Sequence, residues 1–466
     1  MFSVTGRRVV VVGAARSGIA AAELLVGRGA RVVLTETRDS FDAAARLRAA
    51  GVDLELGGHT RETLAGADLI VVSPGVPLEQ PVFDAARERG IEIIGELELA
   101  WRWLRGRVIA ITGTKGKSTT TTVIGRMVSA AGHHTLVGGN IGVPLSEQVE
   151  QSTVDTIHVV EASSFQLETT MTFRPWIALW LNFAADHLDR HPSVNVYAAA
   201  KARIFANQRS DDWAVLNADE PIVMQGAART DARRVLFSPM RAIDSPRVGE
   251  GYTSAFAVEG DWIVRRTSTM AEPVVPVSAV ELTGRHMLGN VVAAVAVAST
   301  AGIPPQAMVE GLHGFRGLEH AMEPAGELDG VRFVNDSKAT NVEAARKSIE
   351  SFERGVVALI GGRFKGGDLR DLAEPLTARG RAVIAIGQSA RLVREALADT
   401  LPVIEASSMH EAVARAYEIA KPDGVVLLAP ACASFDWFRD YAERGRVFKE
   451  EVARLRARFG ESTTKA

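Results

Sequence analysis

The sequence predicts an α/β protein with three successive blocks, each built on a mostly parallel sheet covered by helices. Short apolar runs that suit buried strands alternate along the chain with Ala- and Leu-rich segments of helical period. Several of these runs end in glycine-rich or polar turns, which lie at the ligand-binding edge of such sheets. With 466 residues, of which 47% are hydrophobic and 23% charged, the chain is long enough for about three cores.

The composition disfavours several classes of partner. The formal net charge is −3 and the Lys and Arg residues are scattered, so we expect no nucleic-acid or anionic-membrane surface. The longest apolar run, residues 291–298, is far too short to span a bilayer, and the N-terminus has no signal-peptide pattern. The single cysteine, Cys432, fits a reducing compartment. We therefore expect a cytoplasmic protein that acts on small molecules.

The first block begins with a βαβ unit: a strand at 7–12, a helix to about Arg28 and a strand at 31–35. Its turn, G-A-A-R-S-G, resembles the dinucleotide fingerprint, with Glu36 at about the spacing expected of a ribose-binding acid. Ala15, however, replaces the glycine that lets the backbone approach a pyrophosphate. A turn that packs the helix, or that holds another nucleotide-like ligand, is therefore favoured over an NAD site.

A second strand of this block, residues 67–72, ends in S-P-G-V-P (73–77). Two prolines restrict the backbone of this loop. The loop lies at the carboxyl edge of the predicted sheet, where α/β proteins place ligands.

The second block carries the strongest local motif, V-I-A-I-T-G-T-K-G-K-S-T at 108–119. An apolar strand ends in a glycine loop that leads into a helix. Gly113 and Gly116 let backbone N–H groups surround phosphate oxygens, and Lys117 supplies a positive charge. The hydroxyl of Ser118 or Thr119 can bind Mg²⁺. A strict phosphate loop has glycine in place of Ile111, yet nucleoside triphosphate binding remains favoured over a simple turn.

Further strands at 157–161, 176–181 and 213–216 extend this sheet, and residues 252–277 suggest a small antiparallel patch before a helix near Arg285. Two polar clusters follow strand ends. Glu161 begins E-A-S-S-F-Q-L-E and is either an oxygen ligand for Mg²⁺ or a helix cap or solvated carboxylate. His187, in N-F-A-A-D-H-L-D-R-H-P, is a general base, a metal ligand or a structural histidine.

The third block has strands at 331–334, 356–360, 382–386 and 425–428. The first is followed by N-D-S-K-A-T-N (335–341), which is either part of a site or a polar turn that begins a helix. No fixed-period repeat relates the three blocks.

Seven motifs taken together resemble the Mur ligase family. They are G-T-K-G-K-S-T, G-G-N-I-G (138–142), E-A-S-S-F-Q-L-E, D-H-L-D-R, Y-A-A-A-K (197–201), N-D-S-K-A-T-N and P-A-C-A-S-F-D (430–436). They occur in the family's order from about Val9 to about Phe448. The resemblance implies a Rossmann-like N-terminal domain (1–97), a central ATPase domain (98–316) and a Rossmann-like C-terminal domain (317–466).

The resemblance also implies site residues. A uridine-diphosphate substrate would be bound by Arg16, Ser17, Glu36, Thr37, Arg38, Ser73, Gly75 and Asn140. ATP would be bound by Gly113, Thr114, Lys115, Gly116, Lys117, Ser118, Thr119, Asn290 and Asp336. The shell of two Mg²⁺ ions would comprise Ser118, Glu161, His187 and a CO₂-derived carbamate on Lys201. Glutamate would be surrounded by Lys338, Thr340, Lys365, Ser434 and Tyr441. Catalysis would fall to Lys117, Glu161, His187 and Lys201.

The carbamate sets an energetic requirement. Making a lysine neutral at pH 7 costs about 4 to 5 kcal/mol at its ordinary pKa, so burial and nearby cations must offset this cost.

The activity implied is ATP-dependent addition of D-glutamate to UDP-N-acetylmuramoyl-L-alanine through an acyl phosphate, by a monomer. The alternatives are a ligase of the same fold that uses L-glutamate or another acceptor such as a folate, a non-catalytic nucleotide sensor, and a Rossmann oxidoreductase. The sensor remains an alternative because of Ala321. The family's G-L-x-H-R reads G-L-E-H-A here, so the arginine expected near the γ-phosphate is missing. Met287 also replaces a common asparagine.

Overall fold

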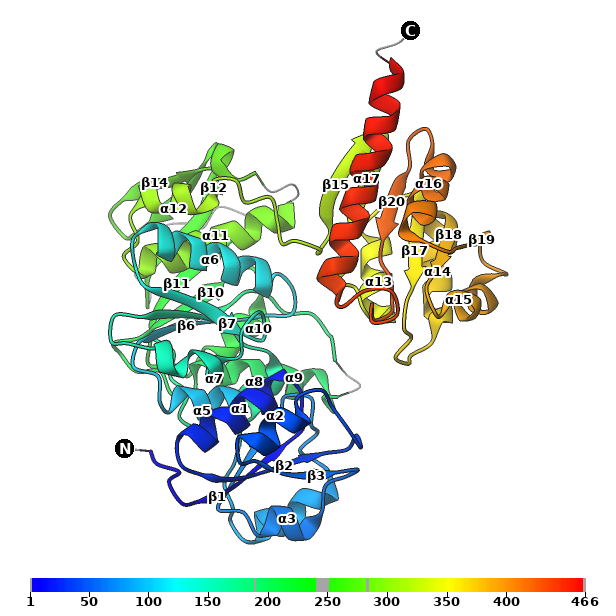
Figure 1. The fold of residues 1–466 in the computed structure, drawn as a ribbon. Coiled ribbons are helices and arrows are strands. Elements are labelled where there is room, and N and C mark those ends of the chain that lie inside the picture. The colour runs from blue at the N-terminus through cyan, green and yellow to red at the C-terminus, as the bar shows by residue number, and fades with distance from the viewer. Residues whose placement is uncertain (1, 188–189, 240–250, 282–284, 464–466) are drawn as a thin grey trace. The chain divides into compact units, whose positions relative to one another are not determined.

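The chain builds three separate sheets, which confirms the predicted α/β class. The structure is a computed structural model that describes residues 2–187, 190–239, 251–281 and 285–463 (Figure 1). Its contacts divide the chain into two compact units, residues 1–315 and 316–466. The first unit holds two of the sheets and the second unit holds the third.

The first sheet has five parallel strands in the order β3-β2-β1-β4-β5. Val9 and Val11 of β1 pack into one core, and Val10 and Val12 pack into another on the opposite face, so both faces are covered. The strands are β1 (Arg8–Val12), β2 (Arg31–Glu36), β3 (Asp53–Leu56), β4 (Leu69–Val72) and β5 (Ile93–Gly95). The helices are α1 (Arg16–Gly27), α2 (Ala44–Ala49), α3 (Arg61–Ala65), the 3-10 helix η1 (Pro81–Phe83), α4 (Asp84–Glu88) and α5 (Glu96–Trp101).

The second sheet has nine strands in the order β14-β13-β12-β11-β10-β9-β6-β8-β7. They are β6 (Arg107–Thr112), β7 (Thr135–Gly139), β8 (Ile157–Glu161), β9 (Ile177–Trp180), β10 (Trp213–Asn217), β11 (Arg233–Ser238), β12 (Tyr252–Glu259), β13 (Trp262–Arg266) and β14 (Ala271–Pro276). The small antiparallel patch predicted at 252–277 is confirmed, and it is formed by β12, β13 and β14. β12 pairs parallel with β11 on one side and antiparallel with β13 on the other.

Helices α6, α11 and α12 pack against one another, and α11 also packs on β11 and β10. The helices of this block are α6 (Lys117–Ala130), α7 (Leu145–Gln148), η2 (Val149–Gln151), α8 (Ser164–Glu168), α9 (Val194–Ala202), η3 (Arg203–Phe205), α10 (Pro221–Gly226), η5 (Val277–Ala279), α11 (Arg285–Thr300) and α12 (Pro305–Leu312). β6 lies between β8 and β9, so the carboxyl ends of these three parallel strands meet at one edge.

The third sheet has the order β15-β16-β20-β17-β18-β19, with only β15 antiparallel. Its strands are β15 (Glu323–Leu328), β16 (Val331–Asn335), β17 (Val356–Gly361), β18 (Gly380–Ile386), β19 (Val403–Ala406) and β20 (Val425–Leu428). Its helices are α13 (Val342–Glu350), η6 (Leu369–Leu372), α14 (Ala373–Arg379), α15 (Ala390–Leu397), α16 (Met409–Ala420) and α17 (Tyr441–Thr463). Within the described residues, no helix combines the length and apolar composition needed to cross a bilayer.

Candidate functional site

The phosphate loop between β6 and α6 is held in shape by Asn182, which follows β9. The Asn182 Oδ1 atom accepts hydrogen bonds from the backbone N–H of Thr114 at 3.0 Å and of Lys115 at 2.9 Å. Its Nδ2 atom donates to the carbonyl oxygen of Lys115 at 2.9 Å. We did not predict Asn182, although its place as the first polar residue after an apolar strand was the available signal. A clamped loop presents its remaining donors to a ligand with little reorganisation.

Glycine is required at two positions of the loop, for a different structural reason at each. Gly116 has φ 79°, the left-handed region that favours glycine. A Cβ atom built on Gly116 would lie 2.3 Å from Asn290 Oδ1, so this close approach also requires glycine. Gly113 has φ 153°, and a Cβ there would lie 3.0 Å from Leu181 Cβ. The structure therefore brings Asn290 of α11 against the phosphate loop.

Lys117 and Lys201 converge on one carbonyl oxygen. The Nζ atom of Lys201 donates to Gly113 O at 2.8 Å, and the Nζ atom of Lys117 donates to the same oxygen at 3.0 Å and to Thr114 O at 3.1 Å. Lys201 lies at the end of α9 and is 1% exposed. Its Nζ atom also lies 4.5 Å from the ring centre of Tyr197.

The pKa of Lys201 is lowered to about 7, first by burial and then by the positive charge of Lys117. The carboxyl groups of Asp186 and Glu161 act in the opposite direction. A large fraction of Lys201 is thus neutral at pH 7, so most of the cost calculated from an ordinary lysine is already met by the fold.

Glu161 ends β8 beside the phosphate strand, opposite Ile111 of β6. Its side chain is 2% exposed, and its Oε1 atom accepts a hydrogen bond from Asn140 Nδ2 at 2.7 Å. The buried Oε2 atom has no hydrogen-bond partner among the described residues. Asn140, predicted at the substrate, therefore orients one oxygen of Glu161 and leaves the other for a further ligand.

His187 has φ 56°, and its side chain is 48% exposed. Its ring packs edge-on against Phe165 of α8 and Tyr197 of α9. The His187 Nε2 atom lies 4.0 Å from Asp186 Oδ2. The exposed ring is accessible to a ligand, which is unlike a buried structural histidine.

No group of three or more His, Cys, Asp or Glu side chains that could hold a metal ion is found among the residues the structure describes. Mg²⁺ does not require one, because it retains waters and is bound by one or two carboxylates together with substrate phosphates. The unpaired buried oxygen of Glu161 suits such a cation. Ser118 is partly exposed in the first turn of α6, whereas Thr119 is buried, so Ser118 is the better placed hydroxyl.

In the first sheet, Glu36 organises the turn between β1 and α1. Its Oε2 atom accepts hydrogen bonds from Ala14 N at 2.7 Å and from Arg38 Nη2 at 3.1 Å, and its Oε1 atom accepts one from Thr37 Oγ1 at 3.0 Å. Burial opposes ionisation, but the hydrogen bonds from Arg38, Ala14 and Thr37 outweigh it and lower the pKa of Glu36 to about 2. The structure therefore brings Glu36, Thr37 and Arg38 together.

Ser73 joins this turn from the end of β4. Its Oγ atom donates to Gly13 O at 2.9 Å, and a Cβ atom on Gly18 would lie 1.9 Å from the same carbonyl oxygen. Arg16 lies on the outer side of the turn, 63% exposed and 3.8 Å from Glu147. Ser17 is partly exposed and Gly75 is exposed. The first sheet thus gathers the predicted uridine-diphosphate residues, apart from Asn140.

In the second unit, three neighbouring parallel strands deliver four of the five predicted glutamate residues to one edge, and Tyr441 begins α17. Lys338 and Thr340 follow β16, Ser434 follows β20 and Lys365 follows β17. Cross-loop hydrogen bonds join Ala431 N to Ala339 O at 3.0 Å and Arg363 N to Ala433 O at 2.8 Å. Lys338, Lys365 and Tyr441 are exposed, and Ser434 is buried. Two exposed cations at one sheet edge suit a ligand with two carboxylates.

Arg444, which we did not predict, ties these loops together from inside. Its guanidinium donates to Ser337 Oγ at 2.9 Å, Ser337 O at 2.9 Å and Cys432 O at 3.1 Å, and the residue is 1% exposed. Burial lowers the pKa of Arg444 to about 10, which still leaves it charged at pH 7. In the sequence it was one of many arginines on a helical segment, with no local motif to mark it.

Asp336 and the turn that contains Ala321 lie on the same side of this sheet. Asp336 Oδ1 accepts a hydrogen bond from Met322 N at 3.1 Å, its Oδ2 is bonded to Ser348 Oγ, and burial raises its pKa. His320 has φ 63°, and its Nδ1 atom lies 2.9 Å from Asn335 Nδ2. Ala321 is partly exposed.

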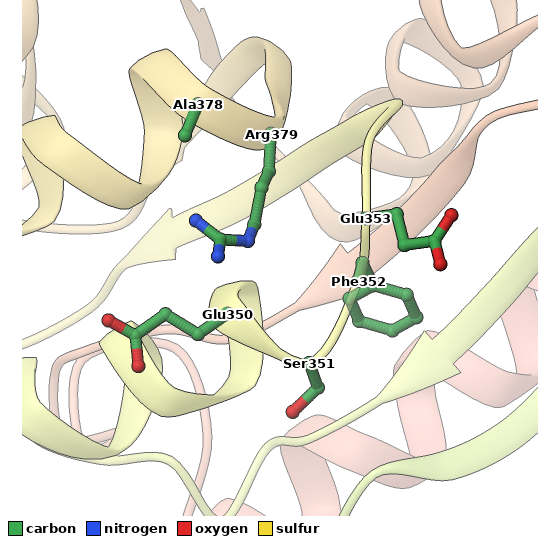
Figure 2. A pocket seen from close by; sticks show the side chains of 6 residues that line it. All are labelled: Glu350, Ser351, Phe352, Glu353, Ala378 and Arg379. Carbon is green, nitrogen blue, oxygen red and sulfur yellow. The ribbon is translucent and has the colours of Figure 1, made fainter.

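A pocket of about 400 Å³ lies elsewhere in the second unit, at the C-terminal ends of α13 and α14 (Figure 2). Its lining comprises Glu350, Ser351, Phe352, Glu353, Ala378 and Arg379. None of these is a predicted site residue, so the pocket is separate from the loops described above.

Family models match three parts of the chain. They are the Mur ligase MurD-like N-terminal domain at residues 7–95, the Mur ligase middle domain at 111–298 and the Mur ligase glutamate ligase domain at 322–432.

Curated relatives match almost the full length. A UDP-N-acetylmuramoylalanine--D-glutamate ligase of Acidobacterium capsulatum is 46% identical over 452 residues, covering 96% of each chain. One of Pelotomaculum thermopropionicum is 44% identical over 458 residues, covering 97% of this chain and 98% of its own.

Solved structures share the fold at low identity. A UDP-N-acetylmuramate-alanine ligase of Thermotoga maritima aligns with a TM-score of 0.54 at 17% identity, covering 96% of this chain and 100% of its own. A pseudomurein peptide ligase type C of Methanothermus fervidus aligns with a TM-score of 0.52 at 19% identity, covering 97% and 100%.

Proposed function

This chain belongs to the Mur ligase family, and we propose that it adds D-glutamate to UDP-N-acetylmuramoyl-L-alanine at the expense of ATP, in peptidoglycan precursor synthesis. The observation that carries the proposal is near-full-length identity of 44–46% to ligases of that name, together with a clamped phosphate loop. The assigned regions are residues 1–97 for the uridine nucleotide, 98–316 for ATP and 317–466 for glutamate.

The phosphates of ATP bind at residues 113–119, where the N–H groups and the dipole at the start of α6 favour an anion. Lys117 turns from Gly113 O to the phosphoryl oxygens and neutralises part of their charge. Asn290, and Asp336 of the second unit, are assigned to the nucleoside. Ser118, Glu161 and His187 would hold one or two Mg²⁺ ions, which supply charge neutralisation at the transferring phosphoryl group when bound.

Lys201 is proposed to react with CO₂ and act as a carbamate. Its low pKa supplies the neutral amine that this reaction needs, and its Nζ atom is already among the groups of the phosphate loop. The carbamate would replace a cation by an anion next to Lys117. The positive charge of Lys117 would attract the carbamate, whereas it repels the ammonium form of Lys201.

The uridine diphosphate is assigned to the turn after β1, through Arg16, Ser17, Glu36, Thr37, Arg38, Ser73 and Gly75. The muramoyl part is assigned to Asn140, and glutamate to Lys338, Thr340, Lys365, Ser434 and Tyr441. The terminal carboxylate of the acceptor attacks the γ-phosphate and releases ADP. The glutamate amine then attacks the acyl phosphate, and the tetrahedral intermediate expels phosphate.

The decisive experiment measures ADP release with UDP-N-acetylmuramoyl-L-alanine and either D- or L-glutamate. We expect release that requires the acceptor and D-glutamate, and no more than background with L-glutamate. Lys117→Ala is the matched negative control. ADP release with L-glutamate but not with D-glutamate would identify a ligase of the same fold that uses L-glutamate. Nucleotide binding without turnover would identify the non-catalytic sensor suggested by Ala321.

The remaining assignments are a monomer that uses only small-molecule substrates, in the cytoplasm. The cytoplasm is supported by the single cysteine, which is buried and free, and by the nucleotide form of two of the three substrates. Sedimentation of the purified protein across a range of concentrations tests the monomer.

A further inference from the structure

Arg190 lies between the two ligand-binding regions assigned within the first unit. Its Nη2 atom donates to Val76 O at 3.0 Å, and its Nη1 atom lies 3.3 Å from Glu79 Oε2. Both partners belong to the segment after β4, which begins with Ser73. The guanidinium also stacks over the ring of Phe165 at 5.4 Å, and the side chain is only 16% exposed.

The loop that Arg190 contacts is packed directly on the turn after β1. Val76 N donates to Ser73 O at 3.0 Å, which closes a tight turn. A Cβ atom on Gly13 would lie 3.1 Å from Val76 Cγ2, and Ser73 Oγ bonds to Gly13 O. A displacement of Val76 would therefore disturb the turn to which the uridine diphosphate is assigned.

The backbone of Arg190 is joined to His187 on its other side. Arg190 N and His191 N donate to His187 O at 3.0 Å and 2.9 Å. The His191 ring is 1% exposed, and its nitrogens lie 3.0 Å from Ser164 Oγ and 3.0 Å from Glu168 Oε1. It stacks on Phe165, the ring that also contacts His187. The turn carrying His187 is thus fixed to α8, the helix that follows Glu161.

The contacts of Arg190 differ in strength. Glu79 is 67% exposed, so its ion pair contributes little. The charge-assisted hydrogen bond to a backbone carbonyl and the stacking on Phe165 are shielded from water and contribute more. Arg190 therefore acts mainly by fixing the position of Val76 relative to Phe165 and His187.

We propose that Arg190 is a positioning residue that couples occupation of the uridine-diphosphate turn to the arrangement of His187 and Glu161. It links Val76, beside one ligand region, to the His187 turn and α8, beside the other. The inference rests on the proposed function for the identity of the two ligands. It predicts that a uridine nucleotide and a Mg²⁺–adenine nucleotide strengthen each other's binding through the protein.

Calorimetric titration tests this without turnover. UDP is the first probe, because it lacks the muramoyl-alanine part that would touch ATP directly. The second probe is Mg²⁺ with the non-hydrolysable β,γ-imido analogue of ATP. Each is titrated alone and with the other at saturation, and linkage requires the same factor in both directions. We expect the wild-type chain to bind each ligand at least fivefold more tightly in the presence of the other.

Arg190→Met keeps an apolar stem over Phe165 and removes the guanidinium. In this variant the coupling factor should fall to about one while the affinity for each ligand alone changes less than threefold. Arg190→Lys should restore part of the factor. Arg87→Ala is the matched control. Arg87 also donates to a carbonyl after β4, that of Leu78, but it lies in α4, beside the same sheet, and among the described residues it makes no hydrogen bond, ion pair or ring contact with the His187 turn. It should retain the wild-type factor.

Coupling that persists in Arg190→Met, or that is already absent from the wild-type chain, would overturn the inference and leave the proposed function intact. Equal loss in Arg87→Ala would do the same, because general loosening of the loop would then explain the result. Failure of the wild-type chain to bind either nucleotide would overturn both. A folded state is checked for each variant by thermal unfolding.

Discussion

Lys201 and Lys117 donate hydrogen bonds to the same acceptor, the carbonyl oxygen of Gly113, at 2.8 Å and 3.0 Å. Burial, and then the positive charge of Lys117, lower the pKa of Lys201 to about 7. Nucleotide phosphates would draw Lys117 away, and a carbamate would reverse the charge of Lys201. The contact between Lys117 and Lys201 is therefore electrostatically unfavourable before substrate binds, and this has measurable consequences.

Replacing Lys201 by methionine should change how stability depends on pH. The pKa of Lys201 is lowered from 10.5 to about 7 on folding, so between these values the unfolded chain binds the proton and the folded chain does not. Wild-type stability therefore rises with pH across this window, by up to about 1.4 kcal/mol per pH unit. Lys201→Met lacks this contribution. Its stability relative to wild type should fall by about 3 kcal/mol from pH 7 to pH 9.5.

Urea unfolding in CO₂-free buffer measures this difference at each pH. Lys115→Met, at an exposed lysine of the same loop, is the control and should show no such trend. If the difference in unfolding free energy between Lys201→Met and wild type does not change with pH, Lys201 is not held in an unfavourable charged state below pH 7.

Lys201→Ala should lose at least about a hundredfold in kcat if a carbamate acts there, a size typical of one lost electrostatic group. Added acetate or formate should recover part of the activity, since a short carboxylate can enter the space left by the side chain. Initial ADP release at increasing carboxylate concentration gives the result. Lys117→Ala under the same conditions should show no recovery, because a carboxylate cannot replace a cation.

Lys117→Ala should abolish nearly all turnover, by about 10³-fold or more, because Lys117 is the cation assigned to the transferring phosphoryl group. Single-turnover ADP formation separates the chemical step from product release. Activity within a few-fold of wild type would show that Lys117 does not contact the phosphates.

Gly116→Ala should weaken nucleotide binding by at least tenfold. The new Cβ atom would lie 2.3 Å from Asn290 Oδ1 in a backbone at φ 79°, so both the loop and Asn290 must move. Gly132→Ala is a matched control, because Gly132 has φ 84° but no atom within 4 Å of the Cβ position. Both variants carry the backbone strain, and only Gly116→Ala should show the tenfold loss in a titration with the ATP analogue.

Local patterns were enough to locate the phosphate loop and the strand ends, because each depends on neighbours in sequence. The sequence marked Asn182 as the first polar residue after a strand, but its contact with the phosphate loop could not be derived, since that requires knowing that β9 lies beside β6. The bond from Asn140 to Glu161 likewise depends on the pairing of β7 with β8. The antiparallel patch at 252–277 was predicted, but not the parallel pairing of β12 with β11, because a strand with one parallel and one antiparallel neighbour has the same alternation as any other.

The three hydrogen bonds of Arg444 also limit how this protein can diverge. One guanidinium links the backbone of N-D-S-K-A-T-N to that of P-A-C-A-S-F-D, two segments almost a hundred positions apart. A lineage that loses this arginine leaves buried carbonyl groups in both segments without a partner at once. Substitutions at Arg444 and in these two segments should therefore accumulate slowly. Recombination within the last third of the gene should be tolerated only where the exchanged piece keeps an arginine that fits both segments.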